Sequence, residues 1–171
     1  MGKIFFTADT HFGHTSILQF CNRPWKTIAK MNRALIRNWN DSISENDTVY
    51  ILGDFVWAGP SKQHEVETIV NKLNGTKILV YGNHDRLTPI QYTECGIHQV
   101  IYPYTKYLSY YLFHDPALAV ACPNYSICIT GHHHGIYGKT REVKGNKIII
   151  DVGVDIWDYK PVEFNEIYET R

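Results

Sequence analysis

Five short segments of this chain place acidic, histidine or asparagine side chains directly after an apolar run. The segments are Asp9-Thr10-His11, Gly53-Asp54, Gly82-Asn83-His84-Asp85, His114 and Gly131-His132-His133-His134. Carboxylate, amide and imidazole groups bind divalent cations, and imidazole also exchanges protons with a substrate. No segment contains a cysteine, so a structural zinc site is not expected. The donors instead favour Mn, Fe, Ni or Zn, and the residue types do not choose among these metals.

The first two segments are weak signals when each is taken alone. At the end of a strand, residues two apart point to the same side, so Asp9 and His11 are placed to hold one cation. The same pattern also fits a strand-end turn with a surface histidine. Asp54 carries a carboxylate that can bridge two cations, but aspartate is also common in loops.

The longer segments are more specific. Gly82 lets the backbone turn sharply, and Asn83 offers a neutral oxygen to a hard cation. His132 and His134 share one side of an extended segment, where they can serve one metal or two neighbouring metals. A polar turn and a solvated loop are the plainer interpretations of these segments. His114, taken alone, is more typical of a hydrogen-bonded core histidine.

The elements before these segments predict how the side chains meet. Strand-like apolar runs cover residues 3–8, 48–52, 77–81, 110–113 and 125–130. Amphipathic helices are predicted over residues 27–45, with Thr27 as a cap, and over residues 61–74, with Ser61 as a cap. This alternation over the first 81 residues predicts a largely parallel sheet of the α/β class. The carboxyl ends of such strands converge on one crevice, so we expect the five segments to gather there.

The second half of the chain changes character. Residues 97–157 contain several short strand-like runs and little helical periodicity. Residues 144–147 read as a hairpin turn between strands at 139–143 and 148–152, and a short helix is expected over 164–169. We therefore expect antiparallel strands that form a second sheet packed on the first. Residues 1–171 are expected to form one domain.

Composition narrows the function classes. Lys plus Arg equals Asp plus Glu at 17 each. This balance argues against electrostatic binding of long nucleic acid over a broad surface, but it does not exclude a small nucleotide as substrate. The four cysteines are scattered, which favours reduced thiols in an intracellular protein. The apolar run from Ile4 to Phe6 is too short for a signal segment, and no run approaches the ~18 residues of a membrane span. We expect a cytoplasmic protein without a membrane partner; the oligomeric state is left open.

The ordered motifs D-x-H, G-D, G-N-H-D, H and G-H-x-H resemble the calcineurin-like metallophosphoesterase superfamily. The segments 153–157 and 159–162 look like the end of its small, uncapped bacterial and phage-type members. The resemblance implies a four-layer α/β/β/α sandwich with two mixed β-sheets and two bound divalent cations, foremost Mn. It implies that one cation takes Asp9, His11, Asp54 and His134, and that the other takes Asp54, Asn83, His114 and His132. Asp54 would bridge the two.

This ligand set leaves other polar residues for catalysis and substrate binding. Two cations roughly 3.5–4 Å apart hold and acidify a water that attacks phosphorus. His84 lies outside the ligand set, so we expect it to protonate the leaving group, with Asp85 as its orienting partner. His14 and Arg86 are candidate substrate contacts, and so is Arg23, although a surface histidine and solvated charges are the alternatives.

One departure from the family pattern bears on these substrate contacts. Many members carry a further aspartate shortly after the G-D motif, whereas Phe55-Val56-Trp57 follows here. Contacts that orient the substrate are therefore expected to differ from those of such members.

The leading interpretation is hydrolysis of phosphate esters, with phosphodiesters preferred and a small phosphate ester or nucleotide as substrate. A nuclease acting on short nucleic acid is the alternative enzyme. A non-catalytic scaffold of the same fold is disfavoured, because such relatives tend to lose the histidine that is present here as His84. A metallo-β-lactamase fold expects H-x-H-x-D-H, whereas Gly135 and Ile136 follow His134. The tyrosines between positions 102 and 111 fit either a half-buried sheet, which we favour, or a surface that stacks a nucleobase.

Overall fold

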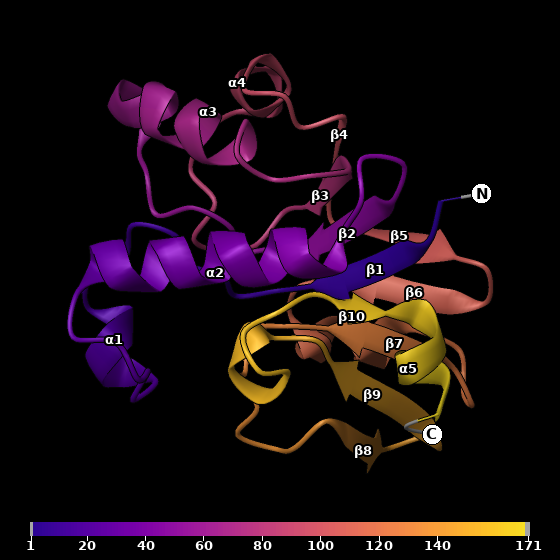
Figure 1. Cartoon of the computed structure of the whole chain (residues 1–171). Coiled ribbons are helices and arrows are strands. Elements are labelled where there is room, and N and C mark those ends of the chain that lie inside the picture. The colour runs from indigo at the N-terminus through magenta and orange to yellow at the C-terminus, as the bar shows by residue number, and fades with distance from the viewer. Residues whose placement is uncertain (1, 170–171) are drawn as a thin grey trace.

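Two β-sheets lie face to face in the computed structural model, which describes residues 2–169 (Figure 1). The first sheet has the order β10-β1-β2-β3-β4, with β1 (Ile4–Thr7), β2 (Thr48–Leu52), β3 (Thr76–Val80), β4 (Gln99–Ile101) and β10 (Val162–Glu163). The second has the order β5-β6-β7-β9-β8, with β5 (Tyr104–Tyr107), β6 (Tyr110–Phe113), β7 (Ile127–Thr130), β8 (Thr140–Val143) and β9 (Lys147–Asp151). β1 to β4 run parallel, as do β6, β7 and β9, while β10, β5 and β8 are antiparallel edge strands. Both sheets are therefore mixed, as predicted.

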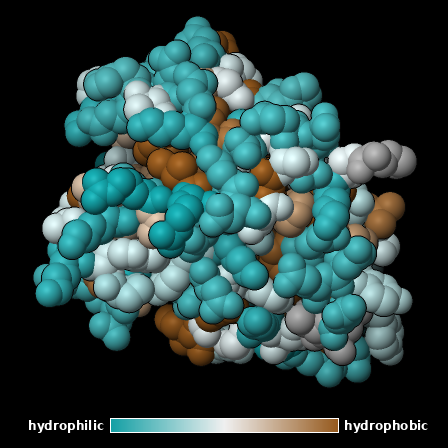
Figure 2. Space-filling view, viewed as in Figure 1, coloured by the Kyte–Doolittle hydropathy of each residue, from teal (hydrophilic) through white to brown (hydrophobic). Residues whose placement is uncertain are grey.

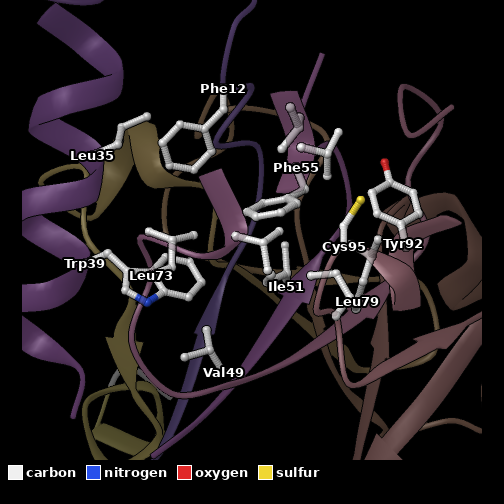
Figure 3. Packing of buried hydrophobic residues seen from close by; sticks show 14 of the residues in the cluster. Phe12, Leu35, Trp39, Val49, Ile51, Phe55, Leu73, Leu79, Tyr92 and Cys95 are labelled. Carbon is white, nitrogen blue, oxygen red and sulfur yellow. The ribbon is translucent and has the colours of Figure 1, made fainter. Parts of the chain in front are cut away.

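Three helices cover the outer face of the first sheet, namely α2 (Ile28–Ser42), α3 (Gln63–Val70) and α4 (Pro89–Glu94). Met31, Leu35 and Trp39 recur along one side of α2 and are buried with Val49 and Ile51 of β2 (Figure 3). The opposite side of α2 faces solvent, and the surface in this view is mostly hydrophilic, with hydrophobic side chains visible in the hollows between elements (Figure 2). An amphipathic pattern at helical spacing thus fixes the position of α2 on the sheet.

A second apolar core fills the space between the sheets. Alternate residues of β2 serve the two cores, because Val49 and Ile51 face the helices while Leu52 joins the inner core. The inner core also receives Ile129 and Ile150 from the second sheet, and Phe164 of α5 (Phe164–Glu169) packs against it. Strands that are buried on both faces explain the nearly continuous apolar runs in the sequence.

The outer face of the second sheet carries the fourth layer of the predicted sandwich, which is thin. The 3₁₀-helix η2 (Pro116–Ala121) lies there, and its Ala119 packs with Phe113, Cys128 and Ile149. The order of layers is thus helices, sheet, sheet and a single short 3₁₀-helix. The remaining short elements are α1 (Ile17–Phe20), η1 (Pro60–Lys62) and η3 (Val154–Ile156).

Several predicted elements are confirmed and others are corrected. The β8–β9 hairpin, α5 and the Thr27 cap of α2 are present as predicted, the Thr27 side chain accepting a hydrogen bond from the Lys30 amide. The helix predicted over 61–74 is shorter, because η1 precedes α3 and Asn71 already ends it. The strands predicted to be antiparallel are parallel in β6, β7 and β9, since long connections join them. The pattern also missed α4, a six-residue helix with a capping box at Thr88 and Gln91.

None of the helices within residues 2–169 combines the length and the apolar character that crossing a bilayer requires.

Candidate metal centre

The five predicted segments meet at the carboxyl ends of strands from both sheets. Asp9 follows β1, Asp54 follows β2, and His114 follows β6. His114 Nε2 lies 3.4 Å from Asp54 Oδ2, and His114 Nδ1 lies 4.0 Å from Asp9 Oδ1. Among the described residues, three sets of side chains bring potential ligand atoms within 4.8 Å of one another. Two contain residues of the predicted segments alone, namely Asp9, His11 and His134, and Asp9, Asp54 and His114, and the third is Cys21, His134 and Asp155. Residues that are more than 100 positions apart in the sequence therefore share one centre.

Unusual backbone angles turn the donor side chains toward this centre. Left-handed φ values occur at Asp9 (57°), His11 (49°), Asp54 (55°), His132 (75°) and His134 (49°). Such angles cost on the order of 1–3 kcal/mol each for residues other than glycine and cluster at functional sites. Hydrogen bonds from the Asp9 amide to the Gly53 carbonyl (3.1 Å) and from the His11 amide to the Asp54 carbonyl (3.0 Å) tie the first two turns together.

Two glycines allow the loops to approach one another. A Cβ on Gly53 would lie 2.5 Å from His114 Nδ1 and 2.6 Å from the Cα of Gly82. A Cβ on Gly82 would overlap the Asp54 carboxylate and lie 2.5 Å from the Asp54 amide nitrogen. The glycines of the G-D and G-N motifs are thus required by the space between the loops.

Asp9, His11 and His134 form a first donor group, which contains buried side-chain atoms that lack hydrogen-bond partners. Asp9 Oδ1 and His11 Nε2 are buried without a hydrogen-bond partner anywhere in residues 2–169. The ring of His134 stacks on that of His11, with ring centroids 5.3 Å apart. Burial raises the pKa of Asp9 to about 7 and lowers the pKa of His11 to about 3, so His11 is neutral and keeps a lone pair. An orphaned carboxylate oxygen and imidazole nitrogen in one buried site fit a divalent cation.

Asn83, His114 and His132 form a second donor group, in which each potential ligand atom lies close to the other two. His114 Nδ1 donates to the Leu52 carbonyl at 2.8 Å, so the neutral ring has a lone pair on Nε2. His114 Nε2, which carries that lone pair, lies 2.8 Å from Asn83 Oδ1 and 3.2 Å from His132 Nδ1. Burial lowers the pKa of His114, but the hydrogen bond and charge of Asp54 outweigh it, together with Asp9, and raise the pKa to about 9. A divalent cation that replaced the Nε2 proton would be held by Nε2 together with Asn83 Oδ1 and His132 Nδ1.

Asp155 and Arg23 support the first donor group through hydrogen bonds to His134 and to the Asp9 carbonyl. His134 Nδ1 donates to Asp155 Oδ2 at 2.8 Å, which leaves Nε2 for a metal. The buried Arg23 contacts both Asp155 oxygens at 2.8 Å and donates to the Asp9 carbonyl at 2.7 Å. The interpretation of Arg23 as a substrate clamp is therefore wrong. Sequence reasoning missed Asp155, because 132 positions separate it from Arg23 and nothing in the local pattern indicates that the two side chains pair.

Asp85 supports the loops and does not orient His84. Its carboxylate accepts hydrogen bonds from the amides of Asp54 (2.9 Å), Phe55 (3.0 Å) and Gly82 (2.9 Å) and from the Tyr92 hydroxyl (3.0 Å). Burial raises the pKa of this carboxyl group, and the hydrogen bonds oppose the rise. These four donors occupy both carboxylate oxygens. The sequence prediction that Asp85 orients the His84 imidazole is therefore wrong.

A cleft of about 600 Å³ opens beside the first donor group. Its lining includes His11, His14, Trp57, His84 and His134. The His84 amide donates to Asp54 Oδ1 at 2.8 Å, and the imidazole borders the cleft.

Trp57 brings the two predicted substrate contacts together. The His14 ring stacks on Trp57 with centroids 3.9 Å apart and planes inclined by 6°, and the Arg86 guanidinium carbon lies 4.2 Å from the Trp57 ring centroid. The sequence signal for Trp57 was its place after the G-D motif, where many family members have an aspartate. The tyrosines at 102–111 are not part of the cleft lining, and the Tyr107 ring packs edge-on against Phe6 of the inner core.

Comparisons with known proteins agree with this geometry. The sequence profile of a family described as "Calcineurin-like phosphoesterase" matches residues 2–158. An uncharacterized protein of Methanocaldococcus jannaschii is 32% identical over 168 residues, which cover 98% of this chain and 90% of that protein. The Gene 66 protein of a Mycobacterium phage is 31% identical over 90 residues, which cover 53% of this chain and 44% of that protein. A solved structure of a protein of unknown function from Aquifex aeolicus has the same fold, with a TM-score of 0.74, 24% identity and 100% coverage of both chains.

Proposed function

Because this chain belongs to the calcineurin-like phosphoesterase family of metal-dependent hydrolases, we propose that it hydrolyses phosphodiesters with two bound divalent cations. The observation that carries the proposal is the position of one oxygen. Asp54 Oδ2 lies 3.5 Å from His11 Nε2 and 3.4 Å from His114 Nε2. It therefore borders both donor groups, as an oxygen shared between two cations must. Burial raises the pKa of Asp54, but the hydrogen bond and charge of His114 outweigh it and lower the pKa to about 2, which keeps this oxygen ionised.

The donor groups divide as the family resemblance implies. Asp9, His11, Asp54 and His134 would hold one cation, and Asp54, Asn83, His114 and His132 the other. When bound, such a pair lowers the pKa of a water between the cations and neutralises charge on the phosphoryl oxygens. Mixed oxygen and imidazole donors suit Mn²⁺, our first choice, as well as Fe, Ni and Zn.

His84 is the proposed proton donor to the leaving group. Its amide is fixed on Asp54 Oδ1, and its ring centroid lies 5.6 Å from that of His11. The imidazole thus borders both the donor groups and the cleft, where the leaving oxygen of a bound ester would lie. A small phosphodiester or nucleotide fits this arrangement, because a diester carries an organic group on each side of phosphorus and the cleft extends beyond the donors.

Hydrolysis of bis-(p-nitrophenyl) phosphate with added Mn²⁺ tests the proposal. The Asp54→Asn variant is expected to lose activity together with bound metal. Equal rates in the variant and the parent protein would refute the enzyme claim and favour a non-catalytic scaffold. Parallel assays with p-nitrophenyl phosphate and with a short oligonucleotide separate a diesterase from a monoesterase and from a nuclease.

The role of His84 is tested by His84→Ala. Turnover should fall by about 10²–10⁴-fold, which is the usual contribution of one positioned proton donor. Metal content, measured by elemental analysis, should stay near that of the parent protein. His98→Ala is the matched control, because His98 is exposed and does not line the cleft. Loss of metal from His84→Ala would instead make His84 a ligand.

A further inference from the structure

The cleft beside the donor groups has an apolar side that hydrolysis alone does not require. Phe20, from α1, and Ile136, which follows the three histidines, are each 77% exposed, and both line this cleft. Ile17 and Trp57 line it as well. Single exposed hydrophobic residues are ordinary on a protein surface, but here residues from three distant segments gather beside His11 and His134. A group bound there is in contact with apolar side chains and adjacent to the metal donors.

The aromatic members of the cleft have a geometry suited to a flat ring. The Trp57 amide donates a hydrogen bond to the Phe12 carbonyl at 2.8 Å, which fixes the backbone that carries the indole. His14 lies parallel to it at 3.9 Å, and the Phe20 ring stands edge-on to His14 at 6.3 Å. His84 lies 5.2 Å from Trp57 between ring centroids. An ester group positioned for proton transfer from His84 therefore lies beside an aromatic wall.

The charges and hydrogen-bonding groups of the cleft lining indicate which kind of ring the cleft can bind. Within the part of the chain that the structure describes, the lining of the cleft includes no carboxylate, lysine or arginine. Asn22 stands at the cleft and is exposed, so its amide offers a donor and an acceptor to the edge of a bound ring. An uncharged ring with a polar edge satisfies both features, whereas a plain aryl group uses only the apolar wall.

We propose that this cleft is a nucleobase subsite of the phosphodiesterase, in which Phe20 and Ile136 contact the face of the base, the stacked pair of His14 and Trp57 borders it, and Asn22 contacts its edge. The inference rests on the proposed function, since the metal centre fixes the phosphate end of the substrate. The substrates it selects are phosphodiesters in which a nucleoside lies on the side of the leaving group.

Competition between matched phosphates tests the subsite. AMP and ribose 5-phosphate share a sugar phosphate and differ only in the base, so the ratio of their inhibition constants against bis-(p-nitrophenyl) phosphate isolates the base. In the Mn²⁺-loaded protein AMP should bind roughly tenfold more tightly or better, as expected for one stacked base. Calorimetric titration of both compounds gives the same ratio without turnover. Equal binding of AMP and ribose 5-phosphate would overturn the proposal.

Single substitutions test which residues produce the preference for AMP over ribose 5-phosphate. Phe20→Ala and Ile136→Ala change exposed side chains, so the fold is retained, and each should shrink the AMP preference severalfold. Ile90→Ala is the matched control, because Ile90 is 70% exposed on α4 and lies outside the cleft. An unchanged preference in both Phe20→Ala and Ile136→Ala would refute the assignment.

Asn22→Ala distinguishes a nucleobase from a simple aryl group. The variant should weaken AMP binding and leave phenyl phosphate binding unchanged, since phenyl phosphate has no polar edge. If phenyl phosphate binds the parent protein as tightly as AMP and Asn22→Ala affects neither, the nucleobase assignment is wrong. Failure of the parent protein to hydrolyse any diester would refute the proposed function. Calorimetric comparison of AMP with ribose 5-phosphate would still test the subsite, because it does not depend on turnover.

Discussion

Replacing Asp85 with asparagine should destabilise the protein more than it alters the chemical step. The carboxylate is buried and accepts four hydrogen bonds, two on each oxygen. The amides of Asp54 and Gly82 share Oδ2, while the Phe55 amide and the Tyr92 hydroxyl share Oδ1. Asparagine keeps the shape of the side chain but turns one acceptor oxygen into a donor. At least one N–H group then faces another N–H group inside the protein.

The magnitude follows from the least costly orientation of the new amide. With its nitrogen at the Oδ1 position, the Tyr92 hydroxyl can rotate to accept, but the Phe55 amide is left unpaired, at a cost of about 1–3 kcal/mol. The two hydrogen bonds that remain on the oxygen lose their charged acceptor, which weakens each by about 1 kcal/mol. The expected loss in the free energy of unfolding is about 3–5 kcal/mol, a large share of the ~5–15 kcal/mol typical of a domain.

Urea denaturation with a chelator present measures this loss apart from metal binding. Tyr92→Phe is the matched control, because it removes one hydrogen bond, keeps the carboxylate and should cost only about 1–2 kcal/mol. The reasoning fails if Asp85→Asn loses less than about 1 kcal/mol of stability and turnover nevertheless falls about 100-fold. That pattern would return Asp85 to the role of orienting His84.

Three further predictions concern the donors and their supports. Asp155→Asn removes the charge behind His134 and should weaken metal affinity by about 10–100-fold in a competition titration with a chelator. Burial raises the pKa of Asp9 to about 7, so a metal must displace a proton there at lower pH, and affinity should fall as the pH drops below about 7. Calorimetry in two buffers of different ionisation enthalpy counts that proton. Gly82→Ala places a Cβ on the Asp54 carboxylate and should cost about 1–3 kcal/mol in thermal unfolding.

The donors were predictable because each of the five donor segments follows its own strand. An apolar run followed by glycine, aspartate or histidine is a local pattern, and parallel topology alone brings the carboxyl ends of β1, β2 and β3 to one edge. The second sheet was harder, because its direction depends on connections that carry no helical periodicity. Even so, His114 and His132 lie beside each other, since β6 and β7 are parallel and end at the same edge.

The supporting residues were not predictable, for a physical reason. Adjacency to His84 indicated a catalytic role for Asp85, but the turn at Gly82 folds the carboxylate back onto the amides of the neighbouring loop. Arg23 looked like any solvated cation until the fold paired it with Asp155. A charged residue has the same local pattern whether it is buried or exposed, and only tertiary contacts decide which of the two it is.

These buried supports explain how the donor loops hold their strained geometry before any metal binds. Five donors in the left-handed region cost about 1–3 kcal/mol each, so their sum is comparable to the stability of a whole domain. Interactions within the folded chain must offset that strain. Arg23 bonds the carbonyl of Asp9, and Asp85 bonds the amide of Asp54, so a buried charge holds each of these two turns. We therefore expect Arg23 and Asp85 to preorganise the metal centre, and the Asp85→Asn experiment in chelator measures that contribution directly.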